Sequence, residues 1–209
     1  SDLSGKLKGN GVIVEIGSWK GKGAIYMANS LNKDIKIYSI DPLNDIDENI
    51  IKFGLSNTII HIKDIEENII KNWSKPIELL FVDAHYYDYE LTKKLLVNWS
   101  KYIVVGGVLA LNNVCPSFYG IFNNKSLFGL PKIKKAMFEF IMASKNFNNF
   151  KSYGCIGYVT KCKERNCIDN VKCLFTVIKI ELLYVLYRIY RVLSFLYNLF
   201  KRILRIKQK

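Results

Sequence analysis

The sequence is poor in metal-binding side chains. Its 209 residues include two histidines, His61 and His85, and five cysteines, none of which forms a C-x-x-C pair. Structural zinc sites take their four ligands mainly from such residues, so this composition argues against zinc. The odd number of cysteines, with no recognisable secretion signal, favours reduced thiols in a cytoplasmic compartment.

The sequence also lacks an apolar run long enough to cross a bilayer. A spanning helix needs about 20 apolar residues, and Arg188 and Arg191 interrupt the C-terminal apolar segment. Basic charge is uneven: residues 161–209 contain 12 Lys/Arg and 3 Asp/Glu, whereas residues 1–160 contain 19 and 15. The net charge of +13 therefore belongs mainly to the C-terminal segment, and no N-P-P-Y motif occurs. We predict no nucleic-acid partner.

Apolar runs alternate with helical patterns along the first three quarters of the chain. Continuous apolar strands separated by helices indicate a parallel sheet covered on both faces. We predict an α/β fold: a Rossmann-like, doubly wound, mostly parallel sheet with an antiparallel final strand. The expected strands are residues 11–17, 36–41, 58–63, 77–83, 102–111, 150–154 and 155–161, and the expected helices are 22–32, 46–54, 64–73, 88–100 and 131–147.

The chain length fits one domain with an appendage. We place a domain at residues 1–161 and a basic amphipathic helical tail at residues 162–209. The chain begins at Ser1 rather than Met, and we expect its N-terminus to have been trimmed.

A glycine-containing turn, "VEIGSWKGKGA", joins the first expected strand to the first expected helix. A dinucleotide loop needs G-x-G-x-x-G, but counting from Gly17 its later glycine positions hold Trp19 and Lys22. A P-loop also fails, because three residues rather than four separate Gly17 from Gly21. With Glu15 before it, the turn suits a ligand that has a cationic amino-acid end and no phosphate, such as S-adenosylmethionine. The alternative is a purely structural turn.

Polar side chains follow the ends of the expected strands. Asp41, Asp64, Asp83 and the pair Asn112–Asn113 all come where a strand ends, and ligands of open α/β sheets bind at that edge. Asp41 lies 24 residues after Gly17, at a distance that suits hydrogen bonds to ribose hydroxyls. Its alternative role is that of a helix N-cap before Pro42.

These motifs resemble those of the class I S-adenosylmethionine-dependent methyltransferases. More narrowly, residues 10–161 are similar to small-molecule O-methyltransferases, including the enzymes of macrolide and aminocoumarin sugars. The similar segments are "VEIGSWKGKGA", "SIDP", "LLFVDAHYYDYELTKKLLVNW", "VVGGVLALNNV" and "GLPKIKKAMFEFI…GCIGYVTK".

The resemblance implies a role for each site residue. Asp41 would bind the ribose, and Asp64 would lie near the adenine, with an N-cap as the alternative for Asp64. Asp83 would serve both the cofactor and the chemistry. The methionine part would contact Glu15, Gly17, Ser18 and Gly21.

The resemblance also implies a base and a metal site. His85 would take the proton of the acceptor hydroxyl, with Asp88 as its competitor and a surface histidine as the structural alternative. Asp83, Asn112 and Asn113 would hold a divalent cation such as Mg²⁺, but two amides in place of carboxylates make a weak site. We assign His61 a structural role.

The C-terminal segment has the pattern of an interfacial helix. At 100° per residue its polar face holds Arg188, Arg191, Asn198, Arg202 and Arg205, and apolar side chains lie opposite. We predict that it lies on an anionic membrane surface. The alternative is packing on the domain or on a partner subunit.

We therefore predict an O-methyltransferase that modifies a glycan or another hydroxylated small molecule at a cytoplasmic membrane face. Two alternatives stay open: a catechol-like, metal-dependent O-methyltransferase, and a non-catalytic cofactor-fold module tethered to a membrane. The sequence allows a homo-oligomer.

Overall fold

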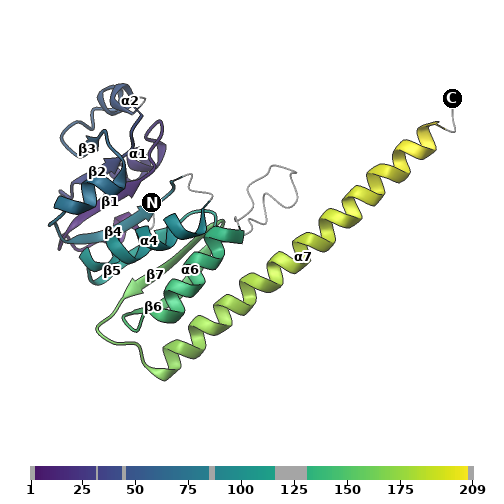
Figure 1. Ribbon diagram of the computed structural model, residues 1–209. Helices are drawn as coiled ribbons and strands as arrows, with labels where there is room; N and C mark the ends of the chain where they lie inside the picture. Colours follow the sequence, from purple (N-terminus) through teal and green to yellow (C-terminus); the bar gives the residue numbers. More distant parts are fainter. Residues whose placement is uncertain (1–2, 32, 44–45, 85–87, 116–130, 207–209) are drawn as a thin grey trace.

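The computed structural model is built around a seven-stranded sheet (Figure 1). It describes residues 3–31, 33–43, 46–84, 88–115 and 131–206, with side chains up to residue 201. The strands run in the order β3-β2-β1-β4-β5-β7-β6. Their bounds are β1 Val12–Ile16, β2 Ile37–Ile40, β3 Ile59–Ile62, β4 Ile77–Val82, β5 Ile103–Leu111, β6 Phe147–Tyr153 and β7 Ile156–Lys161.

The first five strands are parallel, and β7 runs antiparallel to both β5 and β6. The predicted mostly parallel sheet with an antiparallel final strand is confirmed. The predicted strand pair at the C-terminal end of the sheet is also present, as a hairpin that turns at Gly154, where φ is +57°.

Helices follow the strands as the alternating pattern predicts. Because β1 and β4 carry apolar side chains on both faces, helices must cover both. Ile13 and Leu79 pack with α1 and α2 on one face, whereas Val14 and Leu80 pack with α4 and α6 on the other. The bounds are α1 Lys22–Ala28, α2 Asp47–Lys52, α3 Glu66–Ile69, α4 Tyr89–Trp99, α6 Pro131–Ala143 and α7 Cys167–Ile206, with 3₁₀ turns η1 Ser4–Lys6, η2 Ile70–Asn72 and η3 Ser100–Tyr102.

The segment before β1 is held by a buried carboxylate. Glu78, at the amino end of β4, accepts the backbone N–H groups of Gly9 (2.9 Å), Asn10 (3.0 Å) and Lys8. These bonds satisfy a charge that would otherwise be costly to bury. They fix the point at which the chain enters the sheet.

The C-terminal segment forms one continuous helix, α7, which divides into two parts. Its first half packs on the domain: Cys173, Ile180 and Tyr184 are buried in the main core. Thr176 Oγ1 donates to the carbonyl of Phe150 in β6 at 2.9 Å. The helix then continues away from the sheet, as the long green-to-yellow helix of Figure 1 shows. The predicted tail is therefore part packed element and part projection.

This division predicts that two truncations of α7 differ in stability. A chain ending at Lys161 loses the buried Ile180 and Tyr184, and burial of such a side chain stabilises by roughly 1.5–3 kcal/mol. A chain ending at Arg191 keeps them. We expect urea unfolding to show the shorter chain less stable by at least about 3 kcal/mol. Equal stability of the two truncated chains would show that the packed half of α7 contributes nothing to the domain.

Candidate active site

A pocket of about 480 Å³ opens at the carboxyl ends of β1, β2 and β4. β1 lies between β2 and β4, so the pocket occupies the point where the strand order reverses, the usual binding position in such sheets. Its volume falls within the range of roughly 300–1,000 Å³ of small-molecule sites. It is lined by Ile16, Gly17, Trp19, Ile40, Asp41, Pro42, Leu43, Asp64, Ile65, Glu66, Asp83 and Ala84.

The turn after β1 needs its glycines. Gly17 has φ +87°, and a Cβ there would lie 2.5 Å from the backbone N and Cα of Ala84. Gly21, at the start of α1, has φ +77°, and a Cβ there would lie 2.5 Å from Cγ1 of Ile46. Gly17 lines the pocket, whereas Gly21 allows the turn to pack closely against Ile46 outside the pocket.

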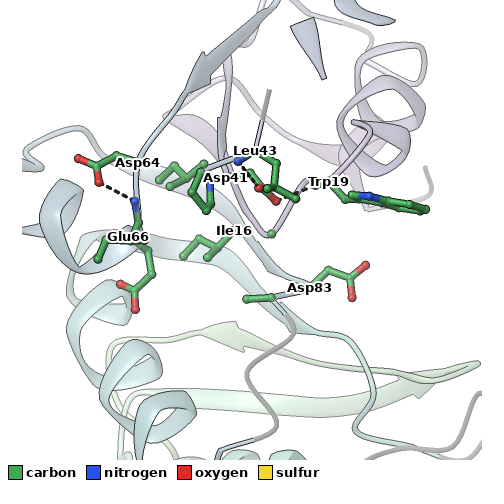
Figure 2. A pocket seen from close by; sticks show the side chains of 12 residues that line it. Ile16, Trp19, Asp41, Leu43, Asp64, Glu66 and Asp83 are labelled. Carbon is green, nitrogen blue, oxygen red and sulfur yellow. Dashed lines mark hydrogen bonds between the residues drawn. The ribbon is translucent and has the colours of Figure 1, made fainter. Parts of the chain in front are cut away.

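Asp41 connects this turn to the end of β2. Its carboxylate accepts the backbone N–H of Trp19 at 2.7 Å and that of Leu43 at 2.9 Å (Figure 2). Helix α2 begins only at Asp47, so Asp41 closes a local turn rather than capping a helix. Each carboxylate oxygen retains a second lone pair that can accept a hydrogen bond from a ligand.

Trp19 adopts an unusual backbone conformation in this turn. Its φ is +46°, which is uncommon for a bulky residue and is held here by the hydrogen bond to Asp41. Trp19 is 58% exposed and is one of the residues that line the pocket. No pattern in the sequence indicates that the backbone N–H of Trp19 donates to Asp41.

Asp64 and Glu66 line the pocket beside Ile65 (Figure 2). Asp64 accepts the side-chain amide of Asn68 (3.0 Å) and the backbone N–H of Ile65 (2.7 Å), which lower its pKa. It therefore bonds to the first turn of α3 while also lining the pocket, although it is not the N-cap. Glu66 was missed by the sequence analysis. It is buried, which raises its pKa, and it accepts the indole N–H of Trp99 at 2.9 Å.

The described part of the pocket wall is acidic. The four ionisable side chains among these described lining residues are all carboxylic acids, and none of the described lining residues is Lys, Arg or His. A phosphate-bearing ligand would meet like charges here, whereas a cationic ligand would meet opposite charges. This charge distribution fits the absence of both phosphate-binding motifs from the turn after β1.

Residues 14–114 match the family model described as a methyltransferase domain. This match identifies the segment as a methyltransferase domain. The segment runs from β1 to just beyond β5, and so contains every residue that lines the pocket. No curated protein matches the chain in sequence.

Solved structures share the fold of this methyltransferase domain. One is the O-methyltransferase from Bacillus cereus in complex with S-adenosylhomocysteine, with 19% identity, 76% of each chain covered and a TM-score of 0.56. The O-methyltransferase TomG from Streptomyces achromogenes, in complex with S-adenosylmethionine, has 16% identity, 73% of this chain and 74% of that chain covered, and a TM-score of 0.52. An rRNA methylase from Streptococcus thermophilus has 15% identity, 78% and 93% covered, and a TM-score of 0.56. At these identities the likeness shows the fold and leaves the acceptor open.

The side chains expected at a metal site are brought together only in part. Asp83 Oδ1 accepts the amide N–H of Asn112 at 2.6 Å, and Asn112 Oδ1 accepts the Cys155 thiol at 2.9 Å. Because the thiol holds the amide oxygen, Asn112 presents its nitrogen, not its oxygen, to Asp83. Asn113 adjoins them with φ +62°. In the part of the chain that the structure describes, no three His, Cys, Asp or Glu residues cluster as metal ligands. This donor set fits Mg²⁺ poorly.

The two candidate bases are in different situations. His85 lies outside the described residues. Asp88 is the N-cap of α4, and its carboxylate accepts the backbone N–H of Leu91 at 3.0 Å. This hydrogen bond engages the carboxylate of Asp88 at the start of α4. His61 contacts Asp47 at 2.8 Å and the carbonyl of Asp41 at 3.1 Å, a structural role.

Glu15 and Ser18 lie beneath the turn rather than in the pocket wall. Glu15 is 1% exposed and accepts the hydroxyl of Ser39 at 2.9 Å, and Ser39 also bonds to Ser18. Burial raises the pKa of Glu15 from 4.5 to about 7, although the serine hydroxyls oppose the shift. A Cβ at Gly23 would lie 2.0 Å from its carboxyl oxygen, so a larger residue there would displace the Glu15 side chain.

Glu15→Gln should change how stability depends on pH. The folded state keeps a proton on Glu15 that the unfolded chain releases between its pKa of 4.5 and the folded pKa of about 7. The free energy of unfolding therefore falls as pH rises through this window, by on the order of 3 kcal/mol. The neutral amide lacks this contribution. Urea unfolding of both proteins at pH 5 and pH 8 measures the difference, and parallel pH profiles would contradict the raised pKa.

Proposed function

We propose that this protein transfers a methyl group from S-adenosylmethionine to a hydroxyl group of a glycan or another hydroxylated small molecule. The observation that carries the proposal is the pocket at the strand-order reversal, whose described lining residues include four acidic side chains and no basic one. S-adenosylmethionine has a sulfonium, an ammonium group and no phosphate. It therefore suits a pocket that would repel a nucleoside triphosphate or a dinucleotide.

The residues of the pocket divide between the parts of such a ligand. Gly17 has no side chain and lines the pocket, so the methionine part would lie against its backbone. The remaining lone pairs of Asp41 would accept the ribose hydroxyls. Leu43 and Ile65 offer apolar surface, with Asp64 beside them, for the adenine. Asp83 stands at the end of β4, toward β5 and the acceptor side.

When bound, S-adenosylmethionine supplies an electrophilic methyl group on a positively charged sulfur. The protein must then place the acceptor oxygen in line with the sulfur–methyl bond and receive the hydroxyl proton. We propose His85 for the proton, two residues after Asp83. Asp83 would orient the acceptor, because Asn112 holds its carboxylate in place. No step requires Mg²⁺, and the engaged amide of Asn112 favours transfer without a metal.

We propose a cytoplasmic location, with attachment to the inner face of a membrane through α7. The five cysteines support the location, since every one is a free thiol. No helix in the described part of the chain is long and apolar enough to cross a bilayer.

Cofactor binding is tested by calorimetry. S-adenosylmethionine and S-adenosylhomocysteine should both bind, and NADH and ATP should not. Asp41→Ala should weaken binding of both sulfur nucleosides by roughly 1–3 kcal/mol, because it removes a charged hydrogen-bond acceptor. Asp47→Ala is the matched control, since Asp47 is an acid of the same region outside the pocket wall. If NADH or ATP bound instead, the proposed cofactor would be wrong.

Turnover is tested with methyl-labelled S-adenosylmethionine and a panel of glycosides and catechols. On an accepted substrate, His85→Ala should lower kcat by roughly 10²–10⁴-fold, as expected for a lost general base, with cofactor affinity unchanged. Activity should withstand a chelator. Unchanged turnover would remove His85 from the mechanism, and loss of activity restored by Mg²⁺ would support the catechol-like alternative. Cofactor binding without turnover across the panel would favour a non-catalytic module.

A further inference from the structure

Helix α7 has a buried side and an exposed apolar side. Cys173, Ile180 and Tyr184 face the domain, and the opposite side is apolar from the start of the helix to Phe200. Phe175, Leu182, Leu186, Leu193 and Phe200 lie on that side, and each is more than half exposed. The exposed apolar face therefore runs along the packed half as well as the projecting half.

The shape of this face distinguishes between possible occupants. Helix α7 has 40 residues, which is roughly 60 Å at 1.5 Å per residue. At 100° per residue its apolar face covers about 140° of the circumference, wider than the seam of two residues per heptad in a coiled coil. A single partner helix would cover only part of it. A flat apolar layer would cover all of it.

The basic side chains of α7 favour an anionic lipid surface as this flat layer. Lys172, Lys179 and Lys201 lie exposed along one margin of the apolar face. Arg188 and Arg191 lie on the other side of the helix. From Leu182 to the last residue the chain has seven Lys/Arg and no Asp/Glu. Long basic side chains at the margin of an apolar face can extend to phosphate headgroups, and basic groups near an anionic surface are stabilising.

We infer that α7 lies along an anionic lipid surface, with its apolar face in the headgroup boundary and the methyltransferase domain on the side away from the lipid. Packing already fixes the rotation of α7 about its own axis, because Thr176 and Tyr184 bond to the domain. The domain is therefore held in one orientation relative to the surface. A flexible basic tail would allow many orientations of the domain.

This orientation places the acceptor edge of the sheet beside the lipid. Tyr184 bonds to the carbonyl of Val114, just beyond the carboxyl end of β5, so α7 passes that edge at its midpoint and continues beyond it. An acceptor carried at the membrane surface, such as the glycan headgroup of a lipid, would meet the site from this side. This consequence rests on the proposed methyl transfer, whereas the docking does not.

Vesicle co-sedimentation of the full chain tests the docking. Vesicles of phosphatidylcholine with phosphatidylglycerol should bind at least tenfold more strongly than phosphatidylcholine alone, and added salt should reduce binding. Leu193→Gln, on the apolar face, should weaken binding about tenfold or more. Phe195→Gln is the matched control, because Phe195 is similarly exposed but lies on the arginine side. It should bind within about threefold of the unchanged chain.

Two results would overturn the inference. One is equal binding of the two variants or of the two vesicle types, with both variants shown by circular dichroism to be folded. The other is concentration-dependent self-association that Leu193→Gln abolishes, which would assign the face to a second copy of the chain. Cofactor titration of the same proteins reports the methyltransferase site separately, so either proposal can fail without the other.

Discussion

The candidate site depends on one close approach between strands. Gly17 brings the end of β1 so near to Ala84 after β4 that no side chain fits between them. That contact opens the turn toward Asp41, whose carboxylate holds the Trp19 backbone in a conformation that bulky residues rarely adopt. The pocket wall is thus set by backbone geometry, and its polar groups are already in place before a ligand arrives. Such pre-organisation reduces the free energy that binding would otherwise use for ordering.

Electrostatics then narrows the range of ligands. Four acidic side chains in one small pocket repel each other unless some are protonated or a cation is present. Glu66 avoids part of this cost through its bond to Trp99, and burial favours its neutral form. A cationic ligand would reduce the remaining repulsion among the acidic side chains. The same charge pattern that costs stability in the free protein therefore favours the ligand class that the turn after β1 suggests.

The sheet was predictable because β1 and β4 are apolar at nearly every position, which only a strand covered on both faces requires. Asp41, Asp64 and Asp83 were predictable as neighbours for a related reason: parallel strands end at the same edge. The local hydrogen bonds were not. Whether Asn112 presents nitrogen or oxygen to Asp83 depends on Cys155, 43 residues away, and no periodic pattern encodes such a contact. Packing of the first half of α7 on the domain was only an alternative at the level of the sequence, because an amphipathic pattern does not show which face meets the domain.

The hydrogen bond from Cys155 has a consequence for the C-terminal hairpin. Cys155 lies in the turn between β6 and β7, and through Asn112 it reaches the carboxylate of Asp83. α7 bonds to β6 at Phe150, in the same hairpin. The hairpin therefore joins the long helix to the acceptor end of the site through a short series of direct contacts. Burial raises the pKa of the Cys155 thiol, which favours the protonated form that donates to Asn112. One thiol in the hairpin thus helps to fix the placement of Asp83.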